Sequence, residues 1–423
     1  MRATLARADV TPYQWLVLAV AWLGWVFDSM DSTIYALVLH PALRELLGRP
    51  GQPPPDAGTI GWYGGLIFSL FLIGWAVGGI VFGVLADRLG RTRTMVITIL
   101  MYAVFTGLAA LSHTWWQLAC YRFLTALGIG GEWAAGAALV AEVWPESRRT
   151  QAAGLLQSAW AAGFFLAASI NLLMMHHNWR LIFLIGAAPA LVALLVRLRV
   201  REPERWVQAR AEAGGAGRIA ELFSPRLRRA TWVGSGLAFV AVFGLWGATN
   251  WTPTLVRALP DIQSLDAATQ TAKVSIATMM LNAGALLGYL AFGPLADRLG
   301  RRAAFAIMSV GSAVMLPLTF LAPAGFAHVL ALLPVLGFFN NGIFSGFPIY
   351  LPELYPTRLR ATGAGFCFNV GRVLASLGPF ATGALVAALG SFGRAAGAVG
   401  IIYVLGLLIL PFAPETRGRP LPE

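Results

Sequence analysis

Charged residues are scarce in this 423-residue chain, at 12% of the sequence against the roughly 25% that is typical of soluble domains. Apolar residues make up 57% and the mean hydropathy is +0.69, which excludes an ordinary soluble enzyme and a disordered chain. Cysteine is also nearly absent. Cys120 and Cys367 lie in apolar runs and form neither a disulfide framework nor a metal-ligand pattern. With no nucleophile triad, metal-ligand cluster or soluble domain in the sequence, we expect no enzyme, no cofactor and no metal site.

Long apolar stretches recur along the whole chain. Residues 1–12 are polar and lead into such a stretch without an A-x-A cleavage site, so we interpret it as a retained first span. A spanning helix needs about 20 apolar residues, whereas the strands of a membrane β-barrel have roughly 10. The expected fold class is therefore all-α integral membrane, with twelve transmembrane helices. The expected spans are 13–40, 60–86, 94–112, 115–143, 150–175, 180–199, 230–257, 271–296, 302–321, 326–352, 360–387 and 394–413.

Basic residues indicate the orientation of these spans. The net charge is +12, and Lys273 is the only lysine among 31 basic residues. With the N-terminus in the cytoplasm, 23 of them fall on the cytoplasmic side, including nine arginines between Arg197 and Arg229, and 6 fall on the opposite side. Cytoplasmic loops of membrane proteins carry such an excess. We therefore expect a multi-pass protein of the inner membrane with both termini in the cytoplasm, and no nucleic-acid partner.

Two stretches of the sequence repeat at nearly the same offset. GVLADRLGRTR, from Gly83 to Arg93, returns 210 residues later as GPLADRLGRRA, from Gly293 to Ala303. A second set, at an offset of 211, matches Glu142, Pro145, Arg149 and Gly154 to Glu353, Pro356, Arg360 and Gly365. We predict two six-helix bundles, 1–199 and 230–423, joined by a cytoplasmic linker, 200–229. Parallel repeats of this kind are typical of transporters, whose binding site lies between the halves near the midplane.

The repeated loop offers a candidate gate. Its glycines suit a tight turn, its Asp can face the N-terminus of a neighbouring helix, and its arginines hold the cytoplasmic face. One charged latch in each half would suit a two-state rocking motion, although the motif can also serve topology alone. The candidate gating residues are Gly83, Asp87, Arg88, Gly90, Arg91, Glu142, Arg149, Asp297, Arg298, Gly300, Arg301, Glu353 and Arg360.

The repeated loop motifs are similar to those of the major facilitator superfamily, and the chain resembles that family over nearly its whole length. RFLTALGIGG from Arg122, EPERW from Glu202 and PETRG from Pro414 are similar to further motifs of that family. DSMD, from Asp28 to Asp31, resembles the D-G-x-D pattern of aromatic-acid/proton symporters, with Ser29 in place of the glycine. GGEW from Gly130 is similar to the sialate and metabolite symporter groups. The resemblance implies a secondary transporter working by alternating access, functional as a monomer.

Five charged residues fall at membrane depth, where a charge is costly and marks a functional site by default. They are Asp28, Asp31, Arg122, Glu132 and Arg372. Asp28 and Asp31 share one helix face, and two such carboxylates cannot both ionise cheaply. We therefore predict a proton-coupling site at Asp28, Asp31 and Glu132, with an Arg122–Asp31 pair. For each of these residues a structural ion pair or hydrogen-bonded packing role remains the alternative.

Arg372 is the strongest substrate candidate, because an arginine fork can hold a carboxylate with two hydrogen bonds. Asn369 lies one turn earlier and can orient the ligand. Arg372 also breaks the repeat, since the offset of 211 maps it to Ala161. The remaining candidates for substrate binding are Arg122, Tyr35, Gln157 and Asn250, with Trp160, Trp246, Trp251 and Phe339 as aromatic residues that either line the cavity or only pack.

The sequence thus favours proton-coupled symport of a small organic carboxylate. A sugar or polyol porter and a drug/proton antiporter of the same fold remain alternatives. The two-half repeat argues against a channel, and the five histidines fall near the outer ends of spans, which argues against a histidine proton relay.

Overall fold

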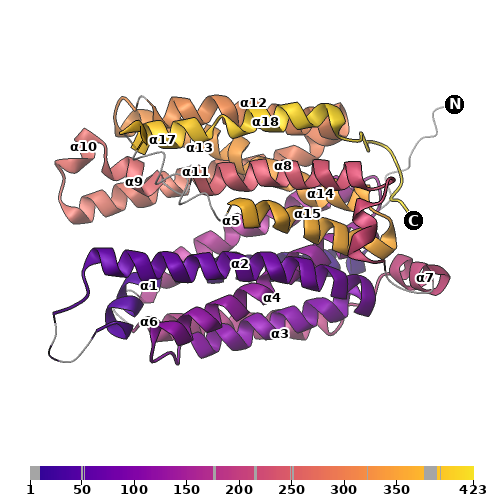
Figure 1. Ribbon diagram of the computed structural model, residues 1–423, viewed down its shortest axis with the longest axis horizontal. Helices are drawn as coiled ribbons and strands as arrows, with labels where there is room; N and C mark the ends of the chain where they lie inside the picture. Colours follow the sequence, from indigo (N-terminus) through magenta and orange to yellow (C-terminus); the bar gives the residue numbers. More distant parts are fainter. Residues whose placement is uncertain are drawn as a thin grey trace.

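The computed structural model consists of helices arranged in two bundles that lie side by side (Figure 1). It describes residues 10–48, 51, 53–174, 178–213, 217–247, 249, 252–321, 323–375, 388–390 and 392–423. Within these residues eight helices are long and apolar enough to cross a membrane.

The N-terminal bundle contains six long helices. Helix ends follow local chemistry: Thr11 forms a capping box with Gln14 at the first, and the Asp56 carboxylate accepts from Thr59 N at 2.7 Å at the second. The helices are α1 (Pro12–Leu46), α2 (Ala57–Leu89), α3 (Arg91–Ala109), α4 (Trp115–Val143), α5 (Arg149–Met174) and α6 (Trp179–Arg197).

The C-terminal bundle is more interrupted. The expected span 326–352 is two helices joined by a 3₁₀ turn, and the span 394–413 is divided near Gly400. The helices are α8 (Arg228–Gly247), α9 (Thr252–Arg257), α10 (Pro260–Gln263), α11 (Ala267–Leu299), α12 (Arg301–Phe320), α13 (Phe326–Gly342), α14 (Gly346–Leu354), α15 (Arg360–Ala375), α17 (Phe392–Val399) and α18 (Ile402–Ile409), with 3₁₀ turns η3 (Ile343–Ser345), η4 (Thr357–Leu359) and η5 (Leu410–Phe412).

The linker between the bundles folds against the ends of the helices. It contains α7 (Glu204–Ala213) and the 3₁₀ turn η1 (Ile219–Phe223). The Glu202 carboxylate accepts from Thr92 N at 3.2 Å and Arg93 N at 3.0 Å, and Trp206 donates to the Asp87 carbonyl at 3.0 Å. EPERW thus caps α3 and holds the linker to the repeated loop.

PETRG performs the same task in the other half. The Glu415 carboxylate accepts from Arg301 N at 3.0 Å and Arg302 N at 3.2 Å, at the start of α12. Partial burial alone would raise the pKa of Glu415, but the backbone N–H groups of Arg301, Arg417 and Arg302 hold it below its ordinary value.

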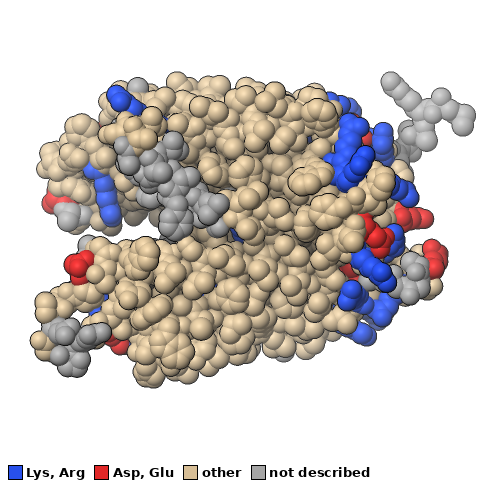
Figure 2. All heavy atoms as spheres, viewed as in Figure 1, with Lys and Arg blue, Asp and Glu red and all other residues tan. Residues whose placement is uncertain are grey.

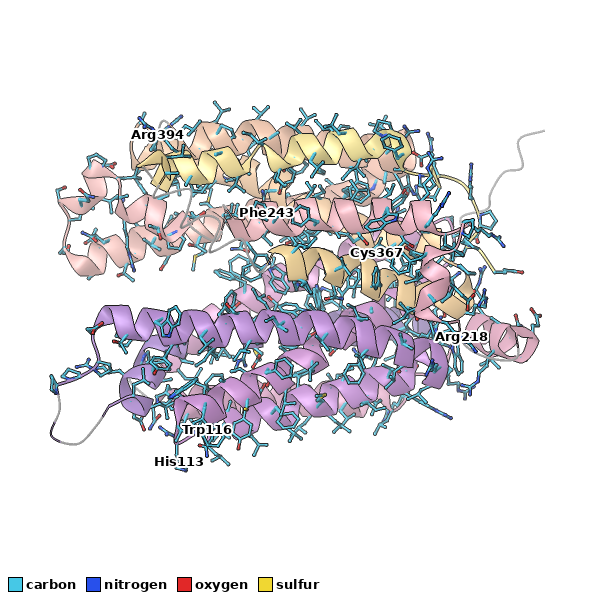
Figure 3. All side chains as sticks on the ribbon, viewed as in Figure 1. His113, Trp116, Arg218, Phe243, Cys367 and Arg394 are labelled. Atoms are coloured by element: carbon cyan, nitrogen blue, oxygen red, sulfur yellow. The ribbon has the colours of Figure 1, made fainter. Side chains whose placement is uncertain are left out.

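Exposed charged side chains are concentrated at the two ends of the molecule. Lys, Arg, Asp and Glu gather at the end that carries α7 and the C-terminus, with fewer at the opposite end, while the middle of the visible face is almost entirely tan (Figure 2). We call this the charged end. Figure 3 places Arg218 at the charged end and His113 and Arg394 at the opposite end. Large apolar side chains such as Leu287 on α11, at 62% exposed, cover the outside, as a lipid-facing surface requires.

The two bundles are joined closely at the charged end and are hollowed between them at the opposite, open end (Figure 2). The contacts between bundles run through α2 with α15 and α5 with α11. Glycine permits the approach. A Cβ on Gly79 of α2 would stand 1.9 Å from Asn369 Nδ2 of α15, and one on Gly293 of α11 would stand 2.6 Å from the Thr150 carbonyl of α5.

Candidate functional site

The first repeated motif builds a buried ionic network across the two bundles at the charged end. Arg91 donates to Asp87 at 2.7 Å and to both oxygens of Glu142, at 2.8 and 3.2 Å. Arg360, from the other bundle, donates at 2.8 Å to Glu142 Oε1, the oxygen that also accepts from Arg91 at 2.8 Å. Asp87 accepts from Thr362 N at 2.7 Å and so caps the start of α15. The network therefore fastens α2, α3 and α4 to α15.

The chain's own C-terminal segment reinforces this network. Arg360 donates a second hydrogen bond, at 2.6 Å, to the carbonyl of Pro422, and Leu421 is buried beside it. Arg91 also donates to the Thr357 carbonyl at 2.7 Å. The charged end is thus closed by residues from both bundles and the tail.

The second copy of the motif is less complete. Arg301 donates to Glu353 at 2.7 Å and to Asp297 at 3.2 Å, and Asp297 accepts from the Thr150 hydroxyl of the other bundle. Arg149, the counterpart of Arg360, pairs with Glu146 at 3.5 Å instead of Glu353, and its Nε has no partner among the described residues. The two copies of the motif therefore form unequal sets of contacts between the bundles.

The remaining motif residues shape the turns. Gly90 and Gly300 have φ values of +113° and +96°, which a residue with a side chain rarely adopts. A Cβ at Gly83 would stand 2.8 Å from the Ala361 carbonyl of the other bundle. Arg88 and Arg298 point outward and are exposed, which matches a topological role.

The Arg122–Asp31 pair expected from membrane depth is present. Arg122 Nη1 lies 2.8 Å and 3.0 Å from the two carboxylate oxygens of Asp31, and both side chains are fully buried. Thr106 donates to Asp31 at 3.0 Å. Tyr35, which the sequence predicts as a substrate contact, lies against the Arg122 guanidinium, whose centre is 4.9 Å from the centre of the tyrosine ring. Arg122 and Tyr35 therefore belong to one buried ion-pair cluster.

Glu132 has a partner that the sequence analysis placed in the cytoplasm. Arg197, counted above among the cytoplasmic arginines, turns inward from the end of α6 and is 1% exposed. Its Nη2 lies 2.6 Å from Glu132 Oε1 and 3.2 Å from the Val20 carbonyl. Arg197 was assigned to the cytoplasm from the position of its backbone, but an arginine side chain is long enough to reach back from a helix end into the bundle.

Of the three acids at this depth, Asp28 is the one that forms no ion pair with a described side chain. It is completely buried, and neither carboxylate oxygen has a hydrogen-bond partner among the described residues. It lies close enough to Glu132, Arg197 and Asp31 to interact with them electrostatically. Two arginines thus serve three acids, which leaves one carboxylate uncompensated.

Arg372 lies at the interface between the bundles without a carboxylate partner in the described part of the chain. Its Nη1 donates to Asn369 Oδ1 at 2.9 Å, and its Nε is buried without a partner. The guanidinium is stacked between Trp75 of α2, at 4.1 Å, and Phe368 of its own helix, at 4.9 Å. Among the described residues, the neighbours that stabilise its charge are therefore two aromatic faces and one amide.

The aromatic surroundings of Arg372 continue across the interface. Trp75 contacts Trp25 and Trp160, with ring centres 6.3 and 5.9 Å away, and Phe68 contacts Trp246 of the other bundle at 5.4 Å. Trp160 and Trp246 are among the aromatic candidates predicted from the sequence. Trp75 is not, because no motif indicates that it lies opposite Arg372.

Gln157 and Phe339, two further residues predicted from the sequence, lie inside the bundles. Gln157 is buried and its Oε1 has no partner among the described residues. Phe339 packs in the C-terminal bundle against Phe338 and the Gly311 position. Asn250 and Trp251 lie outside the described residues. No three His, Cys, Asp or Glu side chains of the described part are grouped so that they could hold a metal ion.

Two six-helix bundles, closed against each other at one end and carrying buried charges near the middle, define a membrane transporter of the two-bundle class. The family model of the Major Facilitator Superfamily matches residues 21–272, and that of "Sugar (and other) transporter" matches residues 319–423. The chain belongs to the Major Facilitator Superfamily, so the resemblance noted in the sequence is confirmed, and it is not an enzyme.

Curated relatives cover nearly the whole chain. A metabolite transport protein of Haemophilus influenzae is 33% identical, over 97% of this chain and 99% of its own. The cis,cis-muconate transport protein of Acinetobacter baylyi is 30% identical over 98% of both chains, and the sialic acid transporter NanX of Escherichia coli is 30% identical over 87% and 86%. A solved structure of the proton:xylose symporter XylE superposes with a TM-score of 0.77 at 17% identity, covering 97% of this chain and 98% of that one. At that identity the superposition shows the fold alone.

Proposed function

We propose that the protein imports a small organic carboxylate together with a proton, by alternating access between its two bundles. The observation that carries this proposal is the separation of unpaired charges: an unpaired acid, Asp28, in the N-terminal bundle, and an arginine without an acid, Arg372, at the interface. Buried charges without partners are costly, so each is expected to acquire a partner during the working cycle.

The ligand proposed for Arg372 is a carboxylate. Arginine retains its charge when buried and offers two parallel donors, which match the two oxygens of a carboxylate. Asn369 binds Nη1 at 2.9 Å, and Nε has no partner among the described residues, so that it is available to a ligand. The relatives support this choice, since muconate and sialic acid are both carboxylic acids. The aromatic rings around Trp75 favour a substrate with a flat, unsaturated body.

The proton is proposed to bind Asp28. Asp31 and Glu132 each form an ion pair with an arginine, whereas Asp28 has no partner among the described residues. A carboxyl group in these surroundings can take up a proton when the cavity is open to one side and release it when the cavity is open to the other. The sequence alone leaves Asp28, Asp31 and Glu132 as candidates for the proton-binding residue, and the proposal selects Asp28 from these three.

The latches are proposed to set which side is open. We assign the charged end to the cytoplasm, because arginines gather there and the positive-inside rule favours that placement. The conformation with the complete Asp87–Arg91–Glu142–Arg360 network is then the outward-facing one, ready to accept substrate and proton from outside. The halves 1–199 and 230–423, joined by 200–229, would rock as two bodies about the interface.

The proposal is tested with purified protein in liposomes. We expect cis,cis-muconate, sialic acid or nicotinate to accumulate against its gradient when the outside is made acidic, and a protonophore to abolish the accumulation. Counterflow of labelled acid should persist without any pH gradient. Accumulation of xylose but of none of the acids would favour the sugar-porter alternative.

A further inference from the structure

Arg197 stands at the end of a transmembrane helix but is buried as deeply as the functional charges. Its guanidinium lies 2.6 Å from Glu132 of α4 and also donates to the Val20 carbonyl of α1. Arg199, only two residues further, is exposed. The inward direction of Arg197 is therefore a specific arrangement and not a general property of this helix end.

The neighbouring helix provides the space for this ion pair. A Cβ at Gly24 of α1 would stand 1.7 Å from Glu132 Oε1 and 2.5 Å from Arg197 Nη2. Gly24 and Asp28 are four residues apart and so lie on the same face of α1. The Glu132–Arg197 pair consequently occupies the face of α1 one turn away from the unpaired acid.

Polar atoms around this point are incompletely bonded. Glu132 Oε2, Arg197 Nε and Nη1, the Tyr102 hydroxyl and both Asp28 oxygens are buried without a partner among the described residues. Native proteins rarely bury so many unpaired polar groups together. The cluster therefore has free donors and acceptors next to the proposed proton site.

We infer that Arg197 is a positioning residue for proton coupling: it keeps Glu132 ionised, so that Asp28 is the single acid of the cluster that gains and loses a proton. The inference rests on the proposed function. A guanidinium 2.6 Å from a carboxylate strongly favours the charged pair. Without that cation, two uncompensated acids would compete for protons in the same buried site.

The other charged groups around the cluster do not substitute for Arg197. On α1, Asp31 is bound to Arg122 of α4, and α3 contributes only the Tyr102 hydroxyl. The helices α2 and α5 carry Asp, Glu, Lys or Arg only at the charged end. On α15, Arg372 stacks on Trp75 and Phe368 instead of reaching an acid of the described part.

The test is infrared difference spectroscopy of the full-length protein between neutral and acid pH, which detects protonated carboxyl groups directly. In the unmodified protein we expect one band from this cluster, and Asp28→Asn should remove it. In Arg197→Gln we expect a second band, which Glu132→Gln in the same chain should remove. Arg197→Lys keeps the charge and should retain the single band, and Arg199→Gln is the matched control from the exposed helix end.

Transport provides the second readout. We expect Arg197→Gln to lower proton-driven accumulation by about tenfold, which is the change in a proton-binding equilibrium that one pKa unit represents. Counterflow without a pH gradient should continue. If Arg197→Gln is not monodisperse, the Glu132→Gln/Arg197→Gln double variant, which leaves neither member of this ion pair charged, should show the Asp28 band alone.

A single, unshifted Asp28 band in Arg197→Gln would overturn the inference even if transport were lost, because Arg197 would then only hold helices together. Persistence of a second protonated band in the double variant would overturn it as well. Undiminished proton coupling in Asp28→Asn, in an otherwise unmodified chain, is a different result: it contradicts the proposed function itself.

Discussion

Removal of the Arg360 side chain should release the closed end of the transporter. In Arg360→Met the hydrogen bond of 2.8 Å to Glu142 across the bundles is lost, while Glu142 keeps its two bonds to Arg91. Hydrogen bonds to charged groups contribute about 1.5–3 kcal/mol, so the ratio of closed to open molecules should fall by roughly 10- to 100-fold. The loss of the bond to Pro422 acts in the same direction.

The assay is a distance measurement across the closed end. Spin labels on cysteines at Leu89 and Leu299, the exposed final residues of α2 and α11, report the separation of the bundles, in a chain whose exposed Cys120 is replaced by serine. We expect Arg360→Met to populate a longer distance. Arg358→Met is the matched control, because Arg358 is partly exposed, pairs with Glu221 and makes no contact of this kind to the other bundle. An unchanged distance distribution in a monodisperse Arg360→Met protein would refute the latch.

Four further predictions concern the buried groups and one surface carboxylate. Asp28→Asn should abolish the response of uptake to an imposed pH gradient; uptake is measured with and without the gradient, and full proton-driven accumulation would contradict this prediction. Asp31→Asn should lower the free energy of unfolding by about 3–5 kcal/mol, because it leaves Arg122 buried without a charged partner; thermal melts measure this loss. Gly24→Ala should cost about 1–3 kcal/mol by forcing the Glu132 side chain aside, which thermal melts measure, with an unchanged melt as the contrary result. The lowered pKa of Glu415 means that its ionised form stabilises the fold above the ordinary glutamate pKa and that this contribution is lost as the pH falls through the lowered value; Glu415→Gln should therefore lose about 0.3–1 kcal/mol near neutral pH, as for a charge at a helix N-terminus, and match the unmodified protein in acid.

The helices and the contacts of the repeated loop were largely predictable from the sequence, because their signals are local. The span 115–143 coincides with α4, and Asp87 lies at the N-terminus of a neighbouring helix as the loop chemistry suggested. The Arg122–Asp31 pair followed from comparing depths in two spans. In these places sequence distance converts directly into position along a helix.

The partners of the other buried charges were not predictable in the same way. Arg197 was counted as cytoplasmic because its backbone stands at a helix end, and only the packing of α6 against α1 shows that its side chain turns inward. At membrane depth the sequence offers three acids and two arginines, Arg122 and Arg372. In the structure the arginine that pairs with Glu132 is Arg197. Arg372 is thereby left without an acid in the described residues, and Trp75 opposite it could be located only from the contact of α2 with α15.

Binding of an organic acid to Arg372 is the most direct test of the account. Nicotinate and nicotinamide form a matched pair, since they share the ring and differ in the charged carboxylate. Titration of folded Arg372→Ala should show nicotinate affinity reduced by roughly 10- to 100-fold, the equivalent of one charge-assisted contact of about 1.5–3 kcal/mol, with little change for nicotinamide. Arg372→Lys should recover little of the loss, because lysine lacks the planar two-donor fork. Unchanged acid affinity in Arg372→Ala would contradict carboxylate recognition at this arginine and assign it a structural role.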